Sequence, residues 1–124
     1  MSVHAGFAAT LTDLFAQALR GPVRCKRMFG GFGFYHDDRF FAVMVDGTPY
    51  LKVDAGTRPA FEAAGLPAWV YLREGRPVTM GFHGLPEAAL DDPEEMRPWV
   101  LLALQAARRT TSPGTGRRRG SRLE

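Results

Sequence analysis

Three groups of residues in this chain are of types that could carry chemistry. Cys25, His36 and Asp37 are the types that form a thiol nucleophile, its base and the group that orients the base. We expect one strand over about residues 28–36, which would separate Cys25 from His36 by some ten residues, or about 35 Å of extended chain. This separation excludes a hydrogen bond between them, so we interpret Cys25 as a buried or incidental cysteine.

His36, Asp37 and Asp38 could supply metal ligands, with His83 or His4 joining them. Adjacent residues lack the i, i+2 or i, i+4 spacing that directs side chains to one point. We therefore interpret the three as a polar turn between strands. We expect no metal site and no cofactor.

Gly30, Gly31 and Gly33 are dense enough to suggest a loop that cradles phosphate. Such loops lie between a strand and a helix and end in Lys-Ser or Lys-Thr, whereas these glycines lead from strand into strand. We interpret them as positions that allow a bulge or close packing. Because no acid, base and nucleophile are paired, we expect that the protein is not an enzyme.

Aromatic and cationic residues are interleaved in the expected strands and could share one face of a sheet. Faces of this kind stack single-stranded bases, but contacts between proteins use the same residue types. We favour a protein interface. Its candidate residues are Tyr35, Tyr50, Lys52, Tyr71 and Arg73, with Thr79 beside them.

The positive charge is concentrated at the C-terminal end. Residues 1–107 hold ten Lys/Arg and twelve Asp/Glu, a net charge of −2, whereas residues 108–124 hold six Arg and one Glu, a net charge of +5. A cationic tail could contact phosphates without sequence preference, and the alternative is that it only adds solubility. Nucleic-acid binding is therefore expected to be weak. The candidate residues are Arg108, Arg109, Arg117, Arg118, Arg119 and Arg122.

Apolar spacing and turn residues define the elements that would position these groups. A helix over 4–20 should end where Gly21, in a left-handed conformation, precedes Pro22. Asp46-Gly47 and Glu74-Gly75 indicate tight hairpins, and Thr57 should cap a short helix. Strands are expected at 28–36, 40–46, 48–54, 69–73 and 76–83, and helices at 4–20, 58–64 and from Asp92-Pro93 to the tail.

The last helix has a capping box at Asp92 and an apolar stripe of Met96, Val100, Ala103, Leu104 and Ala107. Pro98 should kink or restart it. Pro77 should place the start of its strand at a sheet edge or outside the ladder, while the strand's other end alternates as a half-buried strand does. The order predicts an α+β fold, an α-β(3)-α-β(2)-α sandwich with an antiparallel sheet.

The length of 124 residues predicts one domain, residues 1–109, followed by a disordered Arg-rich tail, residues 110–124. No apolar run could span a membrane, no secretory signal is visible, and one cysteine fits a reducing compartment, so we expect a cytoplasmic protein. Strand 40–46 is apolar on both faces. Because monomers rarely leave such patches wet, we expect a homodimer.

Four segments resemble, in order, the TfoX N-terminal domain family: Arg27–Tyr35, Tyr50–Asp54, Arg76–Met80 and Leu90–Pro93. The resemblance covers about residues 5–109. It implies a secretion-chaperone-like fold, no catalytic residues, and a role in transcriptional or competence regulation through protein contacts. Competence regulators of this type carry a second, helix-hairpin-helix-like domain. Here the sequence ends after the Arg-rich tail, so we expect a stand-alone domain.

Overall fold

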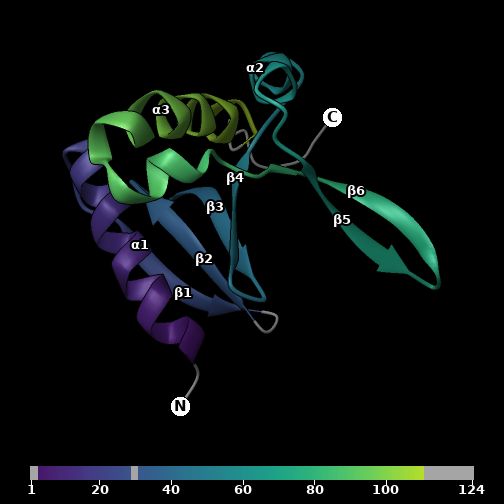
Figure 1. The fold of residues 1–124 in the computed structure, drawn as a ribbon, viewed down its shortest axis with the longest axis horizontal. Helices are drawn as coiled ribbons and strands as arrows, with labels where there is room; N and C mark the ends of the chain where they lie inside the picture. The colour runs from purple at the N-terminus through teal and green to yellow at the C-terminus, as the bar shows by residue number, and fades with distance from the viewer. Residues whose placement is uncertain (1–2, 29–30, 111–124) are drawn as a thin grey trace.

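The computed structural model describes residues 3–28 and 31–110 and has three α-helices and one six-stranded sheet (Figure 1). All strand pairs are antiparallel, and the order across the sheet is β1-β2-β3-β4-β6-β5. The elements are α1 (Val3–Leu19), β1 (Arg24–Met28), β2 (Gly31–His36), β3 (Arg39–Val45), β4 (Thr48–Lys52), α2 (Arg58–Ala63), β5 (Ala68–Arg73), β6 (Arg76–His83), the 3-10 helix η1 (Glu87–Asp91) and α3 (Pro93–Thr110). The predicted α+β class with an antiparallel sheet is confirmed.

The strand predicted over 28–36 corresponds to β2 over Gly31–His36, but the prediction missed β1, the separate strand that ends at Met28 and pairs with β2. Arg27 lies opposite Phe32 and Met28 opposite Gly31, so the first group contains four strands instead of three. Gly31 also passes so close to the neighbouring strand that a Cβ there would collide with the main-chain oxygen of Met44. The prediction that glycine permits close packing here is confirmed.

Helices α1 and α3 pack against each other and cover one face of the sheet formed by β1–β4 (Figure 1). Two ring pairs mark the centre of this core, since Phe15 on α1 meets Phe34 and Phe41 edge to face at 5.1 Å. The apolar stripe predicted for the last helix is fully buried. Its members are Met96, Val100, Ala103, Leu104 and Ala107.

Among the turns that the structure describes, three close hairpins with two residues that both have positive φ, as the predicted turns require. The turns are Asp37-Asp38, Asp46-Gly47 and Glu74-Gly75. The sequence predicted the last two as tight hairpins and the first, between β2 and β3, only as a polar turn.

Helix α1 ends one residue earlier than predicted. The left-handed residue is Arg20, with φ of 58°, and not Gly21. Glycine is needed at 21 for a different reason, since a Cβ there would come within 2.9 Å of the His36 ring. Helix α3 begins where Asp92 Oδ1 accepts the Glu94 N–H at 2.9 Å, and it runs through Pro98 without a restart.

Thr57 is the N-cap residue of α2, as predicted, but its side chain makes no capping hydrogen bond to the helix. The turn before the helix is held by Asp54. Its Oδ1 accepts the N–H groups of Gly56 and Thr57 at 3.0 and 3.1 Å, while the Thr57 hydroxyl is bonded back to Asp54. Arg109 at the end of α3 binds the same carboxylate through Nε and, at 2.9 Å, through Nη2. The hydrogen bond from Arg109 is the main cause that lowers the Asp54 pKa far below its usual value, and one carboxylate thus joins α2 to α3.

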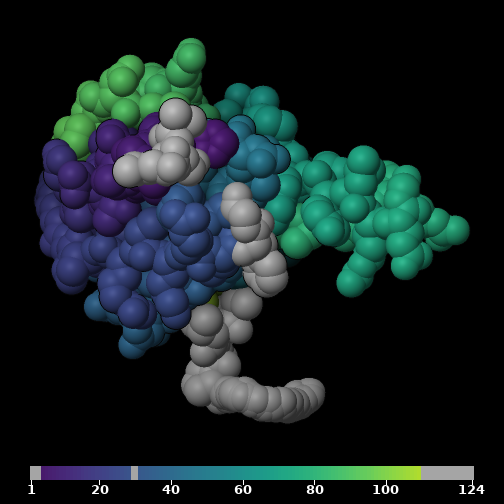
Figure 2. Space-filling model, turned by 90° about the horizontal axis from the view of Figure 1, so that it is seen from below, coloured from purple at the N-terminus to yellow at the C-terminus, as the bar shows by residue number. Residues whose placement is uncertain are grey.

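Strands β5 and β6 form a hairpin that projects from the rest of the molecule (Figures 1 and 2). Strand β6 reaches β4 only at its end, where Phe82 lies opposite Lys52 and His83 opposite Leu51. The part of β6 around Pro77 therefore pairs with β5 alone, so Pro77 lies on an open edge, the first of the two positions predicted for it, while its pairing with Leu72 keeps it inside the β5–β6 ladder. The half-buried alternation predicted for Val78, Met80 and Phe82 holds at Phe82, which is 7% exposed, but not at Val78, which is 37% exposed.

Candidate protein interface on the outer sheet face

The sheet face turned away from α1 and α3, here called the outer sheet face, carries a continuous series of aromatic rings. Tyr35 stacks on Phe40 with ring centroids 5.1 Å apart, and Phe40 meets Phe82 at 5.6 Å. Phe82 meets Trp69 at 6.0 Å, and Trp69 stacks on Tyr50 at 5.9 Å. Rings from five strands, β2, β3, β4, β5 and β6, thus form one connected layer.

Three cations lie over these rings. Arg24 and Lys26 on β1 are 5.7 and 5.6 Å from the centroid of the Tyr35 ring. The Lys52 ammonium is 5.1 Å from the Phe82 centroid and 5.9 Å from that of Phe40. Burial against these rings lowers the pKa of Lys52, and the nearby Asp54 carboxylate opposes part of that shift. The face therefore combines aromatic surface with positive charge.

This layer covers apolar side chains without a second subunit. Val43 and Phe82 point to the outer sheet face, yet they are only 5% and 7% exposed in the single chain. The premise that the outer side of strand 40–46 needs a second subunit as its cover is therefore wrong at Val43, which is already buried in the single chain. The apolar surface left open lies elsewhere, on the β5–β6 hairpin.

The hairpin exposes large apolar side chains on both of its faces. Leu72 is 66% exposed and Tyr71 is 54% exposed, and Val70 and Val78 are also exposed. Tyr71 lies opposite Val78, and strand alternation from Phe82 places both, with Arg73, on the continuation of the outer sheet face. Thr79 lies on the reverse face, opposite Val70.

The structure thus brings together the predicted interface residues by strand register. Tyr35, Tyr50 and Lys52 lie on the sheet, and Tyr71 and Arg73 on the hairpin. Sequence reasoning missed the rings that connect them, which are Phe40, Trp69 and Phe82. Alternation along the predicted strand 76–83 would have assigned Phe82 to a sheet face. The sequence offered no such basis for the face of Phe40.

The predicted separation of Cys25 from His36 is wrong. Because β1 pairs with β2, Cys25 lies opposite Phe34, two residues from His36. The two side chains nevertheless have different partners: Cys25 is hydrogen bonded to Thr12, while His36 Nδ1 lies 2.8 Å from the Pro22 carbonyl oxygen. Cys25 is exposed, so of the two interpretations the incidental cysteine holds and the buried one is wrong. Partial desolvation of its thiol still raises the Cys25 pKa and the Thr12 hydroxyl lowers it in part, so thiolate is disfavoured.

His83 and His36, two of the candidate metal ligands, are held by contacts with neighbouring residues. His83 is buried on the inner side of β6, with its ring against Phe61 and its Nδ1 2.9 Å from the Leu66 carbonyl oxygen. His36 Nε2 lies 3.5 Å from Asp37 Oδ2 in the β2–β3 turn. Within residues 3–28 and 31–110, no group of three His, Cys, Asp or Glu side chains is arranged to hold a metal ion.

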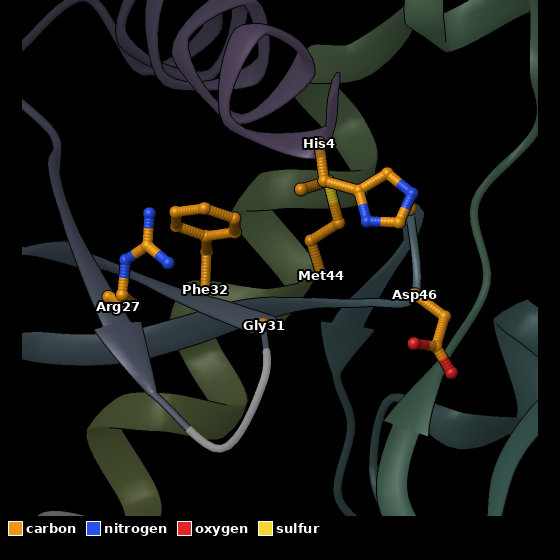
Figure 3. Close-up of a pocket in the computed structure, with 7 residues that line it drawn as sticks. His4, Arg27, Gly31, Phe32, Met44 and Asp46 are labelled. Carbon is orange, nitrogen blue, oxygen red and sulfur yellow. The ribbon is translucent and has the colours of Figure 1, made fainter. Parts of the chain in front are cut away.

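A small hollow lies between the start of α1 and the ends of β1–β3 (Figure 3). His4, Phe32 and Met44 point into it, whereas Asp46 points away. Arg27 lies beside the Phe32 ring, 5.4 Å from its centroid. The hollow has a volume of about 70 Å³, which holds on the order of two waters and no cofactor.

Two of the arginines assigned to the tail belong to the fold. Arg108 and Arg109 lie in α3, and Arg109 is bound to Asp54. The prediction that these two are unstructured is wrong. The remaining candidates lie outside the described residues, and they are Arg117, Arg118, Arg119 and Arg122.

None of the helices in the described part of the chain combines the length and the apolar composition needed to cross a membrane.

Comparison with known proteins gives one family. The family model described as TfoX N-terminal domain matches residues 13–107, which include the sheet, α2, the C-terminal part of α1 and most of α3. No curated protein matches the chain significantly.

Proposed function

The chain belongs to the TfoX N-terminal domain family, and from this premise we propose that it is a regulatory protein-interaction module without catalytic activity. Its partner would bind the outer sheet face and the adjoining hairpin. We place this role in cytoplasmic regulation, including transcriptional or competence regulation. The enzyme alternative lacks support, since the thiol and the nearest imidazole have separate partners.

One observation carries this proposal: the aromatic layer of the sheet continues into a hairpin with large exposed apolar residues. Tyr71 and Leu72 expose more than half of their surface. Interfaces are enriched in aromatic residues and arginine, and a polar rim surrounds their apolar centre. Arg73 and Arg76, opposite each other at the hairpin tip, would form such a rim.

The test is quantitative capture of partners from a lysate of the native cell, using the whole chain as bait. Arg24→Gln and Lys52→Gln remove charge from the outer sheet face, and Arg20→Gln at the end of α1 is the charge-matched control. We expect the outer-face variants to lose at least about tenfold of a captured protein that the control retains. Equal capture by all variants, or no enriched protein at all, would refute the proposal.

A second candidate function is weak binding of single-stranded nucleic acid. The cations over the rings of Tyr35, Phe40 and Phe82 favour it, because stacking platforms for bases combine these groups. The Arg-rich tail would add contacts to phosphates.

Fluorescence anisotropy with labelled DNA and RNA tests this candidate. The full chain is compared with a chain ending at Thr110, which keeps the Arg109–Asp54 contact intact. If the tail binds phosphates, its removal weakens binding and reduces the salt dependence. Unchanged affinity and salt slope would exclude the tail, and loss of binding in Lys52→Gln would then assign it to the sheet.

A further inference from the structure

The two edges of the sheet differ in how they are protected from pairing. Edge strand β1 has the sequence Arg-Cys-Lys-Arg-Met, and charged side chains of this kind block association at an edge. Edge strand β5 has the sequence Ala-Trp-Val-Tyr-Leu-Arg, with no charge before its last residue and no proline. An apolar edge strand with free backbone groups is a template for a further strand.

The turn geometry shows which backbone groups of β5 are free. Arg73 and Arg76 flank a two-residue turn, so they form a hydrogen-bonded pair, and the next pair is not hydrogen bonded. That next pair is Leu72 with Pro77, which agrees because proline has no N–H to donate. By alternation, Val70 and Leu72 both direct their N–H and C=O groups away from β6, toward the open edge.

The hairpin also lacks the cover that a two-stranded ribbon needs. Isolated hairpins are marginally stable in water, and a third strand is usually required. Val70, Tyr71, Leu72 and Val78 are between 37% and 66% exposed in the single chain. They form an exposed apolar patch of the kind that marks a contact with another protein.

We propose that the occupant of this edge is a second copy of the chain, with β5 paired to β5 in antiparallel orientation and Tyr71 on the two-fold axis. An isologous contact needs a strand that complements itself. The free N–H and C=O groups of Val70 and Leu72 can bond to the same groups of a second β5 only in a register that sets each of these two residues opposite Val70 or Leu72 of the partner subunit. Placing Tyr71 opposite Tyr71 of the partner subunit pairs Val70 with Leu72 of the partner subunit and uses the whole length of β5.

Charge agrees with the same register. Arg73 is the only charged residue of β5, and this alignment sets it opposite Trp69 of the partner subunit, where a cation and an indole ring attract each other. The two copies of Arg73 lie at opposite ends of the pairing and do not repel at close range. The two hairpins become a four-stranded ribbon in one sheet that runs through both subunits.

This inference rests on the proposed function, because it assigns one partner to the hairpin part of the proposed interface. The outer sheet face on β1–β4 remains open to a different protein. Loss of one contact therefore need not remove the other.

Disulfide trapping tests the register. In a full-length chain carrying Cys25→Ser, a Tyr71→Cys substitution puts two thiols in a non-hydrogen-bonded pair across the axis, where Cα atoms are about 4.5 Å apart and a disulfide fits. The matched control is Val78→Cys, which lies on the same face one strand away from the edge. Under mild oxidation we expect at least about tenfold more covalent dimer from Tyr71→Cys. Equal yields, or no dimer from either, would overturn the register.

Light scattering measures the association itself. We expect a mass of about twice 13.7 kDa for the unmodified chain, a monomer for Leu72→Lys, and a retained dimer for Thr79→Lys on strand β6. A monomer at every concentration overturns this inference, while capture of a partner through the outer sheet face would leave the proposed function intact. A dimer that captures no partner would support this inference and refute the proposed function.

Discussion

Phe82 is the residue on which packing of the outer sheet face depends most. Its ring meets those of Phe40 and Trp69 and lies under the Lys52 ammonium, and it is 7% exposed although no helix covers it. Truncating a phenylalanine to alanine in a closed core costs about 3–5 kcal/mol. Here the neighbours can collapse from the open side, so we expect Phe82→Ala to lose about 3 kcal/mol, a fall in Tm of about 10 °C.

Urea denaturation followed by far-ultraviolet circular dichroism measures this loss. Leu101→Ala on the solvent side of α3 is the control, since Leu101 is partly exposed and alanine favours helices. We expect it to cost less than about 1 kcal/mol. If Phe82→Ala shifts the urea midpoint no further than Leu101→Ala does, the rings do not form a packed layer. The outer sheet face would then be an open patch that needs a partner to be stable.

Three further predictions concern other parts of the fold. Gly31→Ala should lower the free energy of unfolding, measured by urea denaturation, by about 2 kcal/mol, because the new Cβ would meet the main-chain oxygen of Met44. Gly6→Ala is the control, since it has open space around it and should stabilise α1 by about 0.5–1 kcal/mol. Equal effects of the two substitutions would contradict the close approach at Gly31. Asp54 has a lowered pKa in the folded chain, so its contribution to stability is present above pH ~4 and is lost as the pH falls below that value. The urea midpoint between pH 2 and 5 should therefore fall more steeply in the unmodified chain than in Asp54→Asn, and parallel slopes would refute this. Cys25 has a raised pKa, so iodoacetamide should alkylate it more slowly than free cysteine at pH 7.5 and faster as the pH rises; rapid labelling at neutral pH would contradict the assignment.

Turn chemistry and helix periodicity were the parts of the fold that the sequence could predict. Asp46-Gly47 and Glu74-Gly75 need positive φ at both positions, and few other residue pairs tolerate that. The buried stripe of α3 follows from 3.6-residue periodicity, which local sequence carries in full. Pro77 could be placed at a sheet edge because its missing N–H has the same consequence in any sheet.

Strand β1 could not be found in this way. Arg24, Lys26 and Arg27 give it no alternation of apolar and polar residues, because both sides of this edge strand are exposed. Its existence depends on pairing with β2, which is a tertiary contact. The error about Cys25 and His36 followed from this one omission, since a hairpin brings together residues that a single strand keeps apart.

The composition of the outer sheet face was predictable, but its self-coverage was not. Alternation within one strand places Tyr50 and Lys52 on the same face, whereas the sequence does not fix the register that brings Tyr35 onto it. Whether Val43 is exposed to water depends on the rotamers and strand registers of the residues around it, which an apolar strand alone does not reveal. An apolar strand therefore predicts that a cover exists, without saying whether the cover belongs to the same chain.

On the β5–β6 hairpin, apolar side chains are exposed that the packing of the single chain does not require. Helix α3 turns back over β3 and β4 instead of the hairpin. The strand would form equally well with threonine at 70 and 72, since β-branched polar residues suit exposed strands. Unprotected leucine and valine at a free edge risk aggregation, which charged side chains prevent at the opposite edge, on β1. That the chain keeps them at β5 is best understood if this edge is paired in the working protein.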